Sequence, residues 1–261
     1  MIKSLFRLLT ELSSRKAISR TTGRIAKSRL SRSMIFYFVK TYEIAAGEAE
    51  KPLEQYESLN EFFTRRLKAG SRPIDPAPDA VVSPVDARIT GAGEIREGQL
   101  LNIKGQDYTL QELLGRSPRV VNYTNGFYVI LYLSPADYHR IHVPAAGKIV
   151  ERDHIRGKTY PVNDYGMRNI RRVLSRNERL VTYLQTAAGE IAIVKVGALN
   201  VSSIRYTEPK LDVVDKGDEL AYFEFGSTVV LLFENGIFTP RSDLMINLKV
   251  KMGEAIGTLH R

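Results

Sequence analysis

The stretch Tyr222-Phe-Glu-Phe-Gly-Ser-Thr-Val-Val-Leu-Leu-Phe233 places a glycine-centred segment between two apolar runs of β type. Residues that favour strands, mainly Val, Leu and Phe, fill both runs. Further short runs of this kind follow residue 81, and glycines separate them: Arg88–Thr90, Leu100–Ile103, Gly126–Leu133, Leu180–Gln185, Ile191–Val196 and Leu248–Lys251. Helical patterns come first and strands follow. This order predicts an α+β fold with N-terminal helices and a mostly antiparallel β sandwich or barrel-like core.

The helical pattern is clearest after Ser58. Ser58 and Glu61 have the spacing of a capping box, and the apolar residues that follow recur at helical spacing. We therefore predict a helix over residues 59–68, which the proline-rich cluster 71–78 ends.

The positive charge is concentrated in an N-terminal arm. Of the 261 residues, which carry a formal net charge of +9, positions 1–40 contain ten Lys and Arg against the single acid Glu11. The remaining body has no net charge, which argues against nucleic acid as a partner. The arm also has an apolar stripe at helical spacing: Ile2, Leu5, Phe6, Leu9 and Leu12. This pattern predicts a helix that lies on an anionic membrane; the alternatives are a helix packed on its own protein and an organellar presequence.

Composition excludes several classes of protein. The chain has no cysteine, which rules out disulfides, thiolate metal sites and cysteine nucleophiles, and its 43% apolar and 26% charged residues are typical of a globular protein. The longest apolar runs fall short of the roughly 20 residues that a membrane-spanning helix needs. We expect a soluble or peripheral protein.

Two of the four histidines lie within residues 133–144. Ser134, Pro135 and Asp137 have the order of a helix start, so a short helix is predicted that places His139 and His142 on one face. A metal site would need a third ligand, such as His154, Asp137 or Asp86, and the H-E-x-x-H arrangement is absent from the sequence, so we predict no metal. The structural alternative is a pair of histidines that cap and pack a surface turn.

Two other segments offer reactive side chains. Asp86 lies in a proline-bounded turn before a strand, where its carboxylate is either held rigidly or bonded to its own backbone. The segment 226–228 predicts either a β-bulge or tight hairpin, or a strained peptide bond that the Ser227 hydroxyl attacks. Asp, His and Ser together are the components of a nucleophile activated by an oriented base.

These motifs together resemble the phosphatidylserine decarboxylase family over nearly the whole chain. The matching motifs are Phe62-Phe-Thr-Arg65, Arg72-Pro-Ile74, Ser83-Pro-Val-Asp86, Lys104-Gly105 with Tyr108 and Leu113-Leu-Gly115, Leu133-Ser-Pro135, Asp137-Tyr-His-Arg140 with His142, Asn177-Glu-Arg179, Val196-Gly-Ala198 and Phe225-Gly-Ser-Thr228. Their number, order and spacing carry the resemblance. The chain departs from the family's usual pattern at Phe225, where Leu is commonest, and at Ala87, where Gly is usual; both positions lie outside the reacting atoms.

The resemblance implies a chain that processes itself. The Ser227 hydroxyl would attack the Gly226 carbonyl, with His142 as the base and Asp86 orienting it. Elimination would then release residues 1–226 and leave a pyruvoyl group on residues 227–261. This group would form a Schiff base with the amine of phosphatidylserine and, after loss of carbon dioxide, release phosphatidylethanolamine. His139 would donate a proton or position the substrate carboxylate.

The resemblance also implies the partners and the location. The expected cofactor is pyruvate, bound covalently as the pyruvoyl group of Ser227, with no metal. The large chain (1–226) and the small chain (227–261) would form a heterodimer, with a higher oligomer left open. Residues 1–55 would be the basic membrane-contact region and residues 56–261 the catalytic domain. The enzyme would bind phosphatidylserine in an anionic membrane, peripherally at the cytoplasmic face of the cell membrane.

Two alternatives belong to other classes. A membrane-associated serine hydrolase would use Ser227 on substrate esters, but the Gly-x-Ser-x-Gly elbow is missing around this serine. A non-enzymatic membrane-binding module would need no reactive serine. Both predict an intact chain.

Overall fold

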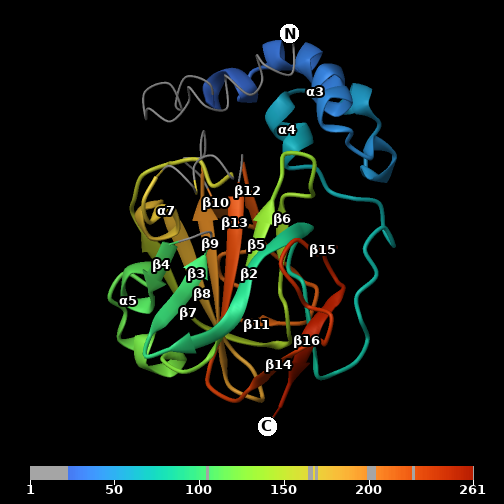
Figure 1. Ribbon diagram of the computed structural model, residues 1–261. Coiled ribbons are helices and arrows are strands. Elements are labelled where there is room, and N and C mark those ends of the chain that lie inside the picture. The colour runs from blue at the N-terminus through green and yellow to red at the C-terminus, as the bar shows by residue number, and fades with distance from the viewer. Residues whose placement is uncertain are drawn as a thin grey trace.

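Strands dominate the computed structural model, which describes residues 23–103, 106–163, 167, 170–198, 204–224 and 227–260 (Figure 1). Each of the eight predicted β-type runs overlaps a strand, and the named strands pair antiparallel. The apolar stripe predicted in the arm lies outside the described residues. Among the described helices none is long and apolar enough to cross a membrane.

The largest sheet has ten strands in the order β11-β7-β8-β9-β13-β5-β2-β3-β4, with β15 paired to β2. The strands are β2 (Ala87–Arg96), β3 (Gln99–Ile103), β4 (Gln106–Thr109), β5 (Phe127–Leu133), β7 (Gly147–Ile155), β8 (Arg179–Gln185), β9 (Glu190–Gly197), β11 (Val213–Val214), β13 (Ser227–Phe233) and β15 (Lys249–Val250). β13 is central, because it pairs along its whole length with β5 and with β9. β11 and β4 do not pair with each other in the described part of the chain, so the sheet is open and does not close into a barrel.

Two three-stranded sheets cover one face of the large sheet. One has the order β10 (Ile204–Tyr206), β12 (Glu219–Phe223), β6 (Arg140–His142), and the other β1 (Ala80–Val82), β16 (Ala255–Leu259), β14 (Phe238–Pro240). One apolar cluster joins Leu131, Ile193 and Leu231 of the large sheet to Phe223 and Ile256 of the small sheets. The predicted sandwich is confirmed.

Short helices and loops cover the other face. A second cluster packs Ile130 and Leu232 of the large sheet against α5 (Leu110–Leu113) and α7 (Val173–Arg176), next to η4 (Pro118–Tyr123). The central strands are thus buried on both faces, and this burial explains why their sequences are continuous apolar runs without alternation.

The N-terminal helices lie across one end of the strands, at the top of Figure 1. They are η1 (Arg29–Ser33), α3 (Met34–Tyr42), η2 (Ala46–Glu48), η3 (Leu53–Gln55) and α4 (Leu59–Phe63). A third cluster joins Ile35 and Phe38 to Phe62 and Phe63, and Ala136 packs against it. This cluster contains residues from both sides of position 55, and the proposed domain division there stays a prediction.

The helix predicted over residues 59–68 is shorter in the structure. Ser58 caps it as expected, since its hydroxyl accepts the N–H of Glu61 at 3.2 Å, but α4 ends at Phe63. Beyond Thr64 the chain is extended: Leu67 forms a β-bridge with Ala49. The β-bridge between Leu67 and Ala49 thus takes the place of the helical turn that was predicted after residue 63.

Candidate active site

The chain crosses from a small sheet to the large sheet between β12 and β13. β12 pairs with β10 and β6, whereas β13 pairs with β5 and β9. The hairpin interpretation of residues 226–228 is therefore wrong, because the flanking strands belong to different sheets. The register of β13 also shows no bulge from Ser227 onward. Gly226 lies outside the described residues, and Ser227 is the first residue of a central strand, opposite Leu133 and Gly197.

The predicted helix around the two histidines is also wrong. A turn precedes Tyr138, and Arg140–His142 form β6, because the N–H of His142 is bonded to Pro84 O at 2.8 Å and β6 pairs with β12. One contact of the predicted helix start is present in the turn, because the Asp137 carboxylate accepts the Ser134 N–H at 2.6 Å. The two histidines consequently share no helix face and have separate partners.

His142 uses both ring nitrogens. Nδ1 lies 2.7 Å from the carbonyl oxygen of Gly217, which can only accept, so Nδ1 carries the hydrogen. Nε2 then accepts from the Tyr138 hydroxyl at 3.0 Å. Burial lowers the pKa of His142, which favours the neutral ring.

His139 has one unused nitrogen. The side chain is completely buried, and Nδ1 donates to Asp137 O at 2.8 Å. Nε2 has no hydrogen-bond partner in the part of the chain that the structure describes. The ring centroid lies 3.9 Å from that of Phe63. Burial lowers the pKa of His139 to about 3, and the positive charge of Arg65 acts in the same direction. The result is a neutral imidazole with a bare Nε2 lone pair.

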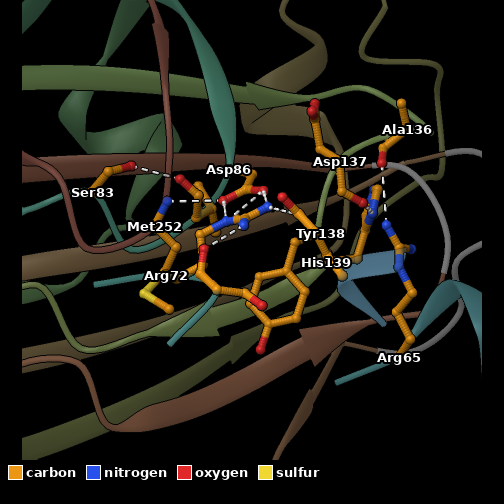
Figure 2. Close-up of polar contacts among 12 residues, drawn as sticks. Arg65, Arg72, Ser83, Asp86, Ala136, Asp137, Tyr138, His139 and Met252 are labelled. Atoms are coloured by element: carbon orange, nitrogen blue, oxygen red, sulfur yellow. Dashed lines mark hydrogen bonds and ion pairs between the residues drawn. The ribbon is translucent and has the colours of Figure 1, made fainter. Parts of the chain in front are cut away.

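Asp86 is held by an arginine. Its turn precedes β2 as predicted, and Arg72 donates to both carboxylate oxygens at 2.8 and 2.6 Å (Figure 2). The N–H of Met252 adds a bond of 2.9 Å, and Arg72 also bonds Glu48 at 2.8 Å. Among the described residues, no hydrogen bond joins the side chains of Asp86 and His142. The triad of Asp86, His142 and Ser227 therefore stays a prediction.

Backbone contacts nevertheless bring the predicted segments together. The N–H of His142 reaches Pro84 in the Asp86 turn, and the N–H of Phe223, near the end of β12, donates to His139 O at 3.0 Å. Ser227 pairs with Leu133, the residue before the histidine turn. The three segments thus meet at one end of the sandwich, beneath the N-terminal helices.

Three side chains of this site had no role predicted from sequence: Arg65, Arg72 and Tyr138. Each belongs to a motif that carries the family resemblance, and this was the only signal available. Their contacts join segments far apart in the chain, so local pattern could not reveal them.

His154, one of the residues offered as a third metal ligand, lies elsewhere. His154, on β7, is bonded to Glu178 at 2.8 Å and is exposed. The described parts of the chain hold no group of three or more His, Cys, Asp or Glu residues placed to bind a metal ion.

A polar hollow of about 440 Å³ lies beside this site. Its walls include Thr64 and Arg66 after α4, Arg140 next to His139, and Glu224 just before the crossing to β13. Lys27 also lines it and pairs with Glu224 at 2.7 Å. The hollow therefore lies where the N-terminal helices meet the end of β12.

Comparison with known proteins gives one consistent result. A family model described as phosphatidylserine decarboxylase matches residues 59–258. The chain is 46% identical over 257 residues to a phosphatidylserine decarboxylase proenzyme of Geobacillus kaustophilus, which covers 98% of this chain and 97% of the relative. Proteins of the same name from Anoxybacillus flavithermus (99% of this chain, 97% of the relative) and Halalkalibacterium halodurans (99% of each) are both 44% identical. The chain belongs to the phosphatidylserine decarboxylase family.

Proposed function

We propose that this protein is a self-processing, pyruvoyl-dependent phosphatidylserine decarboxylase. The observation that supports the proposal most is the placement of Ser227: it begins a central strand directly after a crossing between sheets, at the end of the sandwich where two buried histidines lie. Membership of the family supplies the substrate class.

Processing needs one nucleophile and one base. The Ser227 hydroxyl attacks the Gly226 carbonyl, a C–O bond forms and the peptide C–N bond breaks, which gives an ester and a free amine. Elimination then transfers the Cα proton of residue 227 to a base, breaks the Cβ–O bond and forms a Cα=Cβ double bond, which releases the carboxylate of residues 1–226. Water replaces the nitrogen, which leaves as ammonia, and a pyruvoyl group remains on residues 227–261.

His142 is the base in this proposal. The Gly217 carbonyl fixes its tautomer, so Nε2 is the nitrogen that takes the proton. Burial has the largest effect on the pKa of His142 and lowers it, whereas the bond to Gly217 O and the negative charges of Glu219 and then Asp86 raise it. Asp86 thus stabilises the imidazolium that forms, held in place by Arg72.

The residues present fit a pyruvoyl group at Ser227, because His139 offers a buried, unpartnered nitrogen beside the end of β12. When present, the group supplies the electron sink that loss of carbon dioxide requires. His139 would be the proton donor in this proposal, with Nε2 as the nitrogen that carries the proton, because its own hydrogen is fixed on Nδ1. It would pass the proton of the substrate ammonium to the carbon that has lost carbon dioxide, which requires the bound substrate to raise the pKa of His139 from about 3.

The N-terminal region provides the membrane contact. Leu30 and Phe36 are 85% and 64% exposed and line a surface hollow of about 520 Å³ with Arg29 and Arg32. Apolar side chains next to cations suit the headgroup layer of an anionic bilayer. We propose peripheral binding at the cytoplasmic face of the cell membrane, by a heterodimer of residues 1–226 and 227–261.

Intact-mass measurement of the denatured protein tests the proposal. We expect a large piece that ends at Gly226 and a piece of 35 residues that carries a ketone in place of its amine. The Ser227→Ala variant should stay whole. A wild-type chain that stays whole after long incubation would contradict the proposal and favour a hydrolase or a membrane-binding module.

Replacing the histidines one at a time tests their separate roles. His142→Ala should block cleavage, whereas His139→Ala should still be cleaved and yet decarboxylate phosphatidylserine poorly. The reverse pattern would exchange the two roles.

A further inference from the structure

Arg65 is a buried arginine whose guanidinium is only partly bonded. Its side chain is 5% exposed and makes one hydrogen bond of 3.3 Å, to Ala136 O, and a cation–π contact with the Phe62 ring at 4.9 Å (Figure 2). Among the described residues, Nε and Nη1 have no hydrogen-bond partner and no carboxylate forms an ion pair with Arg65. Burial also lowers the pKa of Arg65. A buried cation without a counter-ion lowers the stability of the fold. The presence of Arg65 at this position therefore indicates a role in function.

The fold satisfies other buried arginines. Arg179 is 3% exposed, and its guanidinium donates to the carbonyl oxygens of Leu113, Asn177 and Glu112 at 2.6, 2.8 and 2.5 Å. Arg72 is paired with two carboxylates, as described above. Buried polar groups in proteins are nearly always bonded in this way. Arg65 is an exception that packing alone does not explain.

The position of Arg65 connects it to the candidate site. Ala136 belongs to the turn that precedes His139, and Phe63 contacts the His139 ring. The sequence neighbours of Arg65, Thr64 and Arg66, line the 440 Å³ hollow that Glu224 also lines. Nε and Nη1 of Arg65 and Nε2 of His139 are buried and have no hydrogen-bond partner among the described residues. These atoms therefore lie against one turn beside one hollow.

We propose that Arg65 binds the phosphodiester of the phospholipid substrate, with Nε and Nη1 as donors; this inference rests on the proposed function. Both N–H groups are buried in this structure, so binding requires residues 64–66 to move away from the Ala136 turn. Only one long hydrogen bond holds the guanidinium to that turn.

The chemistry of the reaction selects the phosphodiester over the substrate carboxylate. An ion pair with the carboxylate would stabilise the ground state and would be lost as carbon dioxide leaves, so it would oppose the reaction. The phosphodiester keeps its charge from substrate to product. An arginine can therefore anchor the phosphodiester without raising the barrier to decarboxylation.

The test compares Arg65→Gln and Arg65→Lys with wild type after mass measurement has shown that each is cleaved before Ser227. With dihexanoyl phosphatidylserine as substrate, Arg65→Gln should raise KM by about 10- to 150-fold, the loss of one hydrogen bond to a charged group, with kcat unchanged. Arg65→Lys should raise KM less. Dihexanoyl phosphatidylglycerol has the phosphodiester but no amine or carboxylate, and its inhibition constant should rise by a similar factor in Arg65→Gln.

Three controls separate anchoring from structural and general charge effects. Arg179→Gln removes a fully bonded buried arginine, so it should lower the melting temperature and leave KM unchanged. Arg65→Met removes an unpaired buried cation, so it should melt at or above the wild-type temperature. Inorganic phosphate at matched ionic strength should compete far more weakly than the lipid analogue.

Several results would overturn the proposal. Unchanged KM and inhibition constants in a cleaved, folded Arg65→Gln protein would remove Arg65 from substrate binding, and a fall in kcat alone would assign it to the chemical step. Melting temperatures lowered in both Arg65→Met and Arg65→Lys would make Arg65 structural. Inorganic phosphate that competes as well as the lipid analogue would show that the site binds a free anion.

Cleavage before Ser227 separates this proposal from the proposed function. Failure of cleavage in the Arg65 variants alone would give Arg65 a role in processing, whereas failure in wild type would refute the proposed function.

Discussion

Tyr138 donates its hydroxyl hydrogen to Nε2 of His142 across 3.0 Å, and both side chains are buried. The direction of this bond follows from the other side of the ring, where Nδ1–H donates to Gly217 O. Burial raises the pKa of Tyr138, so the hydroxyl keeps its hydrogen. If His142 is the base for Ser227, as proposed, the Tyr138 hydroxyl and the proton of the attacking serine compete for one lone pair.

This competition predicts that Tyr138→Phe cleaves itself faster than wild type. Removing one neutral hydrogen bond, worth about 0.5–1.5 kcal/mol, should accelerate the appearance of the 35-residue fragment by about 2- to 10-fold. Tyr123→Phe is a matched control, because it loses an equally buried hydroxyl bond, to Glu190, and should not change the rate. Slower cleavage in Tyr138→Phe would instead make the hydroxyl a proton relay.

The pKa of His139 predicts how stability depends on pH. In the folded protein this pKa is about 3, against an ordinary value of 6.5 for histidine, so the unfolded chain binds the proton at a higher pH. The contribution of neutral His139 to stability is therefore complete above about pH 6.5 and declines as the pH falls toward 3.

Melting temperatures between pH 7.5 and 4.5 check this pH dependence, on a Ser227→Ala background that keeps the sample to one species. His139→Gln should show a shallower decline toward acid than its parent. Equal slopes would mean that His139 does not stay neutral in the fold.

Lys195 predicts a stabilising substitution. Its completely buried amine donates to Thr182 Oγ1 at 2.6 Å and to Ile193 O at 3.1 Å, and no carboxylate among the described residues pairs with it. Burial lowers the pKa of Lys195 well below 10.5. At neutral pH the unfolded chain therefore binds this proton more strongly than the folded chain does, which reduces the free energy of unfolding. Lys195→Met should raise the free energy of unfolding by about 1–4 kcal/mol at pH 7.

The gain from Lys195→Met should shrink as the pH rises toward 10, where the unfolded lysine also loses its proton. Denaturant titrations at pH 7 and pH 10 measure both effects. Lys148→Met, at an exposed position of β7, should change stability by less than about 0.5 kcal/mol. A destabilised Lys195→Met protein at pH 7 would show that the hydrogen bonds of Lys195 outweigh its burial.

The basic arm predicts salt-sensitive membrane binding. Deleting residues 1–22 keeps every described member of the cluster around Ile35 and Phe38, whereas a deletion through residue 40 would remove part of it. The 1–22 deletion should weaken co-sedimentation with phosphatidylserine vesicles, and salt should weaken binding of the full chain, because the screening length falls from about 10 Å at 0.1 M to about 3 Å at 1 M. Equal binding of both proteins at every salt concentration would place the membrane contact on the body.

The central strands could be predicted from sequence because burial on both faces requires continuous apolar runs, as in β9 and β13. The three-residue strands β1, β6 and β10 could not, because three residues carry no periodic signal. At β6 the local signals of Pro135 and Asp137 even favoured a helix. Pairing with β12 decided that segment, and such pairing is invisible in local sequence.

The candidate site was predictable as a set of reactive residues but not as a set of contacts. Sequence motifs selected Asp86, His139, His142 and Ser227. The groups that orient two of them lie elsewhere: Arg72 bonds Asp86, and Gly217 O, 75 positions along the chain, bonds His142. Contacts across such separations depend on the tertiary fold, so spacing along the chain cannot supply them.

The central position of β13 has a consequence for the lifetime of the enzyme. A cut before Ser227 would leave the small chain hydrogen-bonded on both sides of its first strand, while β14 and β16 tie its later residues to a second sheet. Withdrawing this chain would break two rows of backbone bonds and expose the apolar core. If the chain is cut there, this pairing would oppose exchange of the small chain between enzyme molecules under native conditions. A processed molecule whose reactive terminus has been chemically damaged would then be replaced by new synthesis and not repaired with a fresh small chain.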